Sequence, residues 1–278
     1  MRKYGIRLLC FCAIVWGSLL ALIYVNPYSG VICFSEFVLQ LSGSRGEFAL
    51  GFSLPELVSF AMRMVPYFVF EAYFGIAFYR HFCTASVYVF SRYPHRIKWY
   101  LGELVSVGAY ACLYQIILLG TVILVTSLRY QLQVDGAGIV LLLYHFLIYF
   151  VWLYTMTVLI NLLAIRFGSN MSFFLVLGVQ ISCIALLGCA GIAEQKAEIM
   201  GEAFDIWLKW NPVSRLVLGW QESSTDAVNS VLNQSFSALD LNCSVLFCML
   251  LFIVIAFLGA LMVSRHDFLI SDAEEGGR

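Results

Sequence analysis

Long apolar runs separated by polar segments set the pattern of this chain of 278 residues. Each run is about as long as a helix must be to cross a bilayer, roughly 17–25 residues. A backbone in hydrocarbon has to satisfy its own hydrogen bonds, and a helix does this within one segment. The sequence therefore predicts an all-α, polytopic membrane protein with six transmembrane helices, at Leu8–Val25, Leu57–Tyr79, Leu104–Leu128, Ile139–Ile165, Met171–Ala193 and Val245–Val263.

The first two connections on the outer side predict different local structures. Asn26–Glu56 contains apolar residues at positions 31–39, which indicate a short helix lying on the membrane surface or dipping into it. Gly43 and Gly46 are expected to end that helix. The connection near Arg129–Gly138 is short, so we expect the third and fourth spans to be antiparallel neighbours.

The outer segment Glu194–Asn242, before the last run, carries two apolar stretches around Asn211–Pro212. Their helical spacing predicts two short amphipathic helices, and the proline separates them. We expect the tryptophans of this segment to lie in the headgroup layer, where the apolar ring and the N–H are both accommodated, at Trp207, Trp210 and Trp220. The polar stretch Gln221–Asp240 is expected to be a mobile loop.

Charge is scarce and unevenly distributed. Only 12% of the residues are charged, about half the share in a soluble domain, and the net charge of −1 gives no case for nucleic acid. The positive-inside rule places both termini and the loop 80–98 in the cytoplasm of a multi-pass cell-membrane protein. Ten basic residues then lie inside: Arg2, Lys3, Arg7, Arg80, Arg92, Arg96, Lys98, Arg166, Arg265 and Arg278.

Polar residues inside the apolar runs are the candidates for a substrate path: Arg63, Glu71, Gln115 and Gln180. Ionisable residues within spans are functional hypotheses because their burial has to be compensated. Arg63 is near the outer third of its span, so its long side chain is expected to extend outward to the interface. Glu71 has two interpretations: it bonds a hydroxyl or amide of another helix, or it serves a substrate or a proton. His145 and Asn161 are interpreted as helix-packing contacts.

Motifs for catalysis, nucleotide binding and zinc binding are missing from the sequence. There is no GxxxxGK[ST], HExxH, GxSxG or CxxC pattern, so we expect neither an enzyme nor a metal site in this chain. Most of the nine cysteines lie in apolar runs, where cysteine behaves as a small hydrophobe. Cys33 and Cys243 are both expected on the outer side, and the sequence leaves open whether they form a disulfide.

The inner loop 80–98 combines basic and aromatic residues without any acidic residue. Thr84 predicts the start of a two-turn helix that runs to Ser91, and Pro94 predicts the start of a second helix that continues into the third span. The basic residues suit anchoring on anionic lipid. The interleaved aromatic residues also suit a helix that inserts into a groove on a partner protein.

Three stretches resemble bacterial ABC transporter permeases of the export type: YFGIAFYRHFCTASVYVFSRYPHRIKWYLGEL, WNPVSRLVLGWQ and SRHDFL. Small six-span permeases of this kind are linked with peptide, bacteriocin and antibiotic export or self-protection. The resemblance implies short re-entrant helices before the last span, a second permease copy or paralogue, and separate ATPase subunits that bind ATP and Mg. It also implies that a coupling helix contacts the ATPase through Tyr88, Phe90, Arg92, Tyr93 and Arg96.

One departure concerns the N-terminus, where many relatives have a longer amphipathic helix and this chain has only Met1–Arg7 before the first run. Aromatic residues in the fourth span, between Tyr144 and Tyr154, would suit an amphipathic cargo. The alternatives are an ion-coupled transporter or channel without an ATPase, in which Glu71 or Arg63 binds an ion, and a membrane anchor or scaffold.

Overall fold

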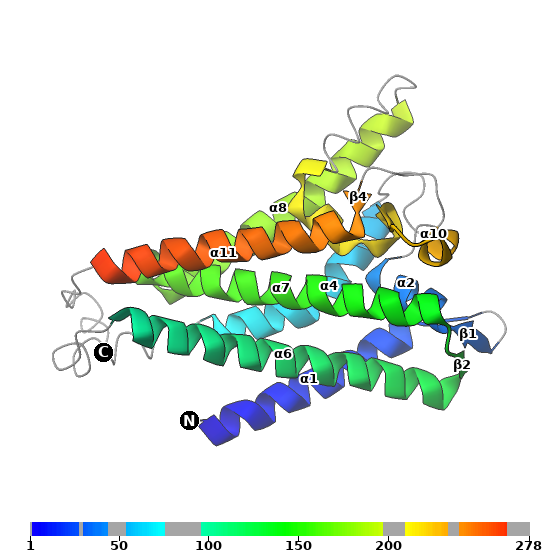
Figure 1. Ribbon diagram of the computed structural model, residues 1–278, viewed down its shortest axis with the longest axis horizontal. Coiled ribbons are helices and arrows are strands. Elements are labelled where there is room, and N and C mark those ends of the chain that lie inside the picture. Colours follow the sequence, from blue (N-terminus) through cyan, green and yellow to red (C-terminus); the bar gives the residue numbers. More distant parts are fainter. Residues whose placement is uncertain are drawn as a thin grey trace.

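The computed structural model describes residues 2–27, 30–43, 54–75, 96–196, 209–232 and 239–265. It is mostly helical, and six of the helices found in these residues are long and apolar enough to cross a membrane. This confirms the predicted all-α membrane fold. The six are α1 (Arg2–Tyr24), α4 (Leu54–Phe74), α6 (Arg96–Arg129), α7 (Gly136–Phe167), α8 (Ser169–Lys196) and α11 (Leu241–Arg265), shown in Figure 1.

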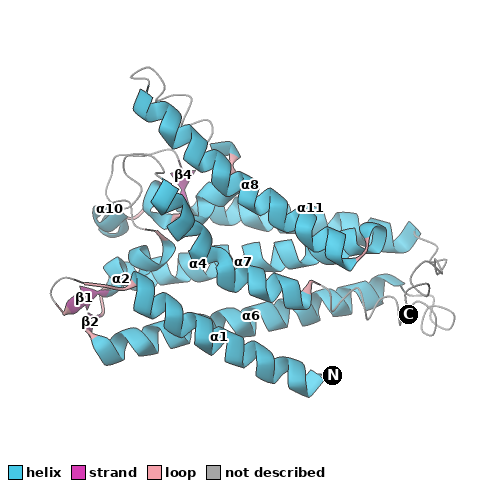
Figure 2. Ribbon diagram, turned by 180° about the vertical axis from the view of Figure 1, so that it is seen from behind, coloured by secondary structure: helices cyan, strands magenta, loops and turns pink. Residues whose placement is uncertain are grey.

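The central helix of the bundle is α7, which contacts α6, α8, α11 and α4. Helix α1 packs along α6, and Figure 2 shows α1 and α4 from behind. The connection between α6 and α7 is short, so these helices are antiparallel neighbours, as predicted. We call the end of the bundle that holds Arg129 and Gly136 the α2 end, and the opposite end, which holds Arg96 and Phe167, the Arg96 end.

Small residues allow close helix contacts, as is common in membrane bundles. A Cβ atom on Gly17 of α1 would lie 2.7 Å from the backbone oxygen of Leu118 and 2.9 Å from the Cβ of Thr121, both on α6. Helix α11, in contrast, carries a stripe of large apolar residues at helical spacing that is exposed on the surface of the protein. Its members are Leu246, Met249, Leu250, Ile253, Val254, Phe257, Leu258 and Leu261. Such a face suits lipid.

At the α2 end, two strand–helix units lie side by side. Strand β1 (Val31–Cys33) leads into helix α2 (Phe34–Ser42), and β2 (Gln131–Gln133) precedes α7; β1 and β2 pair in parallel. The predicted short helix is therefore present as α2. Its apolar side chains do not lie on the surface of the protein, because Phe37 and Val38 are fully buried where α2 packs on α7.

One carboxylate ties the two units together. Asp135 is the N-cap of α7, and its Oδ2 accepts a hydrogen bond from the N–H of Gly138 at 3.0 Å. Its Oδ1 accepts from the N–H of Ser35 in the first turn of α2 at 2.9 Å. A Cβ on Gly138 would meet the backbone nitrogen of Ser35 at 2.4 Å, so only glycine permits this approach. Two helix N-termini, each carrying partial positive charge, thus share one anion.

Residues 209–232 and 239–240, the described parts of the segment before α11, form short elements that pack on the bundle. They comprise the short 3-10 helices η1 (Pro212–Leu216) and η2 (Leu218–Trp220), then β3 (Gln221–Glu222), α10 (Asp226–Leu232) and β4 (Leu239–Asp240). Asn211 begins η1 at the predicted break, accepting from the N–H of Val213 and donating to the Cys183 oxygen on α8.

Two predictions for this segment need correction. The headgroup position predicted for Trp220 is wrong, because Trp220 is only 3% exposed and packs in the core. Trp210 is 81% exposed and Trp207 lies outside the described residues, so for these two the position stays a prediction. The stretch predicted as a mobile loop contains α10, which buries Val228 and Leu232, and β4, which pairs with β3. The stretch is polar overall because only a few apolar residues of α10 pack against the core: Val228 and Leu232, which are buried, and Val231, which is partly buried.

Candidate functional site

Helix α4 brings three polar side chains into the interior of the bundle. Arg63, Tyr67 and Glu71 are four residues apart, and residues four apart share one face of a helix. All three are buried, with at most 3% of each side chain exposed. Two turns separate Arg63 from Glu71, which corresponds to about 12 Å along the axis at 1.5 Å per residue.

Glu71 belongs to a hydrogen-bonded relay across three helices. The Gln180 side chain on α8 donates through Nε2 to Glu71 Oε2 at 2.8 Å. Trp152 on α7 donates through its indole Nε1 to Gln180 Oε1 at 3.2 Å. An indole N–H can only donate, so the amide oxygen must face Trp152 and the amide NH2 must face Glu71. The relay therefore fixes which atom of Gln180 the acid meets.

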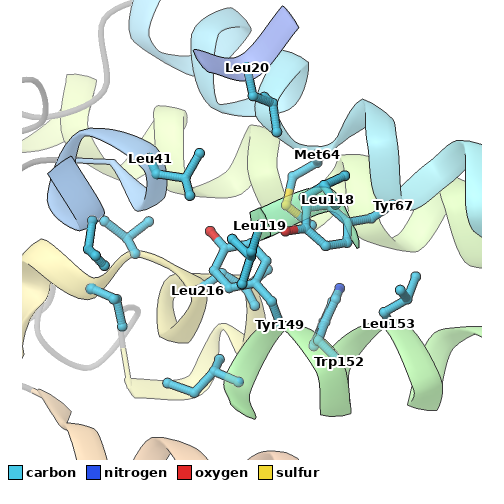
Figure 3. Packing of buried hydrophobic residues seen from close by; sticks show 14 of the residues in the cluster. Leu20, Leu41, Met64, Tyr67, Leu118, Leu119, Tyr149, Trp152, Leu153 and Leu216 are labelled. Carbon is cyan, nitrogen blue, oxygen red and sulfur yellow. The ribbon is translucent and has the colours of Figure 1, made fainter. Parts of the chain in front are cut away.

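A second polar layer lies one turn closer to the α2 end. Gln115 on α6 donates weakly to the Tyr67 hydroxyl at 3.5 Å. The Tyr67 ring lies 5.2 Å from the ring of Tyr149 on α7, which in turn lies 4.2 Å from the His145 ring. Figure 3 shows Tyr67, Tyr149 and Trp152 packed among Met64, Leu118 and Leu119. His145 is 1% exposed, and no described residue hydrogen-bonds either of its ring nitrogens.

Arg63 does not extend outward as expected. Its side chain is 3% exposed, and the guanidinium carbon lies 4.3 Å from the centre of the Tyr24 ring on α1. A guanidinium over an aromatic face is a favourable cation–π geometry. Arg63 therefore has a partner inside the bundle. The sequence position of Arg63, in the outer third of its span, gives no indication of this partner.

The four predicted path residues are thus buried in the same bundle and take part in three different contacts. The structure brings Glu71 and Gln180 together, which realises the interhelical interpretation of Glu71; a role with substrate stays a prediction. It places Gln115 beside Tyr67 and Arg63 beside Tyr24. Sequence reasoning missed Tyr67 and the relay role of Trp152. The four-residue spacing of Tyr67 from both Arg63 and Glu71 was the available signal for Tyr67.

The predicted coupling residues Tyr88, Phe90, Arg92 and Tyr93 lie outside the described residues, and Arg96 begins α6. Within the described part of the chain, no three His, Cys, Asp or Glu side chains are grouped to hold a metal ion. Cys33 and Cys243 are both exposed and both free thiols.

Comparison with models of protein families, with curated proteins and with solved structures finds no match to this chain. The relay holds one acid inside an apolar bundle and links α4, α8 and α7 through Gln180. Such an arrangement can bind a polar or charged ligand, and it ties the exposure of that acid to separation of α4 from α8.

Proposed function

We propose that this chain is the transmembrane permease subunit of an ATP-driven ABC exporter, moving a peptide or an amphipathic, antibiotic-like substrate out of the cell. The observation that carries the proposal is the buried polar interior formed by α1, α4, α6, α7 and α8. Polar groups at this depth are expensive in hydrocarbon and mark substrate or ion pathways. The partner ATPase follows from the resemblance of the loop 80–98 and its flanks.

The length of α6 supports coupling to a partner. The helix has 34 residues, about 51 Å at 1.5 Å per residue, whereas the hydrocarbon core is about 30 Å thick. It begins at Arg96, the last of the proposed coupling residues of the loop 80–98, and continues without a break into the bundle. A displacement of that loop would therefore be transmitted along a rigid rod that carries Gln115.

In this proposal, the Arg96 end faces the cytoplasm of a bacterial cell, where both chain termini lie. A second permease copy or paralogue would complete the translocation path, and membrane lipid would cover the exposed apolar faces of α11 and its neighbours. ATP and Mg would be bound by the ATPase subunits, and rigid motion of the coupling loop would alternate access by rocking helices against one another.

The test is affinity purification of the chain from its native membrane in mild detergent, with mass spectrometry of the proteins that stay bound. We expect a stoichiometric soluble ATPase with the wild type, and its loss after Phe90→Ala combined with Tyr93→Ala. Phe257→Ala, on the exposed face of α11, is the matched control and should retain the ATPase. A wild-type chain that purifies alone, or association that survives the double substitution, would contradict the proposal.

A second candidate is an ion-coupled transporter or channel that works without an ATPase. It is favoured by Glu71 Oε1, which is buried and has no hydrogen-bond partner among the described residues. The purified chain alone, reconstituted in vesicles with a pH-sensitive dye inside, would then carry protons or cations. Flux that is abolished by Glu71→Gln would favour this candidate, and vesicles that stay tight would remove it.

A further inference from the structure

The two carboxylate oxygens of Glu71 differ in their hydrogen bonding. Oε2 accepts from Gln180, whereas no described residue donates a hydrogen bond to Oε1. The side chain is fully buried, at 0% exposure. A buried carboxylate with a single neutral donor is poorly compensated, because the desolvation of a charge is large. Such a carboxyl group is compensated either by a proton or by a positively charged group next to it.

The neighbouring polar groups do not supply that positive charge. Gln180 is neutral and its orientation is fixed by Trp152. Arg63 lies two turns away on α4 and stacks on Tyr24, toward α1. Tyr67 and Gln115 contact each other, and His145 lies against Tyr149, in the layer closer to the α2 end.

Aromatic residues of α4 precede and follow this acid in the helix, and their rings contact rings of α6 and α7. Phe70, next to Glu71 on α4, stacks on Phe74 with ring centres 4.6 Å apart and meets Tyr114 of α6 at 5.0 Å. Tyr67 meets Tyr149 of α7 at 5.2 Å. The faces of aromatic rings attract cations, and aromatic cages are a common device for binding substituted ammonium groups.

We propose that Glu71 and these rings form a binding site for a monovalent, amphipathic organic cation, and that this is the substrate class of the exporter. The inference rests on the proposed function, because it takes the buried interior to be the substrate path. The rings contact one another in this structure, so the site is closed. The ligand would enter when α4 separates from α8 and the hydrogen bond between Gln180 and Glu71 opens.

The experiment uses two probes of the same shape and opposite charge, tetraphenylphosphonium and tetraphenylborate, in equilibrium dialysis against the purified full-length chain in detergent. We expect the phosphonium to bind the wild type, and Glu71→Gln to weaken it at least tenfold. Glu71→Asp, which keeps the charge, should retain binding within a few-fold. Glu36→Gln, on the exposed face of α2, is the control and should bind as the wild type does.

The proposal is overturned if the phosphonium does not bind, if it binds Glu71→Gln as it binds the wild type, or if the borate binds equally well. The second of these outcomes would show that the phosphonium binds without a contribution from the Glu71 carboxylate. ATPase association is read separately on the same variants. A chain that retains its ATPase but binds no phosphonium would refute the substrate class and leave the exporter intact.

Discussion

Gln180 is the residue on which the interior relay depends, since its amide serves Trp152 and Glu71 at once. The Gln180→Leu substitution introduces a side chain of similar size that cannot form hydrogen bonds. It leaves the buried indole N–H of Trp152 and the buried carboxylate of Glu71 without the partner that Gln180 provides. Each unsatisfied buried polar group costs about 1–3 kcal/mol, so we expect a clear drop in the free energy of unfolding. Thermal unfolding in detergent, followed by tryptophan fluorescence, measures it.

Glu71→Gln is the informative comparison for that variant. A glutamine at position 71 can still accept from Gln180 through its own amide oxygen, so its stability should stay closer to the wild type than that of Gln180→Leu. Equal unfolding temperatures for Gln180→Leu and the wild type would show that the relay contributes nothing to stability.

Asp135 allows a prediction about pH. Burial raises the pKa of its carboxyl group, but hydrogen bonds from the backbone N–H and side chain of Ser35 and from the N–H of Gly138 outweigh burial, so the pKa is lowered overall. A lowered pKa in the folded state stabilises the fold at pH values above the unfolded pKa, about 3.9 for aspartate. This contribution is lost as the pH falls through the still lower folded pKa.

We therefore expect Asp135→Ala to lower the free energy of unfolding by about 1–2 kcal/mol at neutral pH, the range for loss of a helix cap. The difference from wild type should narrow below about pH 3.9. Asp240→Ala is the control: Asp240 accepts from the N–H of Cys243 at 2.9 Å at the start of α11 and caps one helix only. A larger loss from Asp240→Ala than from Asp135→Ala would refute the shared cap.

At the scale of elements, the contact between α1 and α6 leaves no room for an added methyl group at Gly17. Gly17→Ala would place a methyl group against the Leu118 backbone oxygen, which cannot move without separating the two helices. Overpacking of this kind costs about 1–3 kcal/mol. Gly120→Ala, on α6 with nothing within 4 Å of its Cβ, should be neutral or slightly stabilising. The measurement is the unfolding temperature of each variant, which we expect to be lower for Gly17→Ala than for Gly120→Ala. Equal unfolding temperatures would contradict the close contact between α1 and α6.

The long elements could be predicted from the sequence because apolar run length is a local property. The six spans, α2 and the break at Asn211–Pro212 all follow from residues within one turn or one run. Trp220 and α10 could not be predicted in the same way. Their burial depends on contacts with α2 and α7, helices far away in the sequence.

The same limit applies to the site. Glu71 stood out as an acid in an apolar run, but its partner Gln180 is 109 residues away, and no spacing pattern connects two different helices at that distance. Arg63 also stood out, and its expected direction was wrong because the position of the Tyr24 ring on α1 is set only by helix packing.

At the scale of the whole molecule, the free thiols Cys33 and Cys243 test the proposed orientation. Both are exposed and both belong to segments at the α2 end. If the Arg96 end is cytoplasmic, a membrane-impermeant maleimide should label each of them from outside intact cells, as the single cysteine of an otherwise cysteine-free chain. Labelling only in inside-out vesicles would reverse the orientation.

The parallel pairing of β1 with β2 has a consequence for biosynthesis. Ser35 and its partner Asp135 lie 100 residues apart, and ribosomes add about 5–20 residues per second, so roughly 5–20 s of synthesis separate the two. During this interval, α1 has left the ribosome while the apolar face of α2, with Phe37 and Val38, has no α7 to cover it. The nascent chain therefore depends on the insertion machinery or on the lipid headgroups to shield this face until α7 has been made.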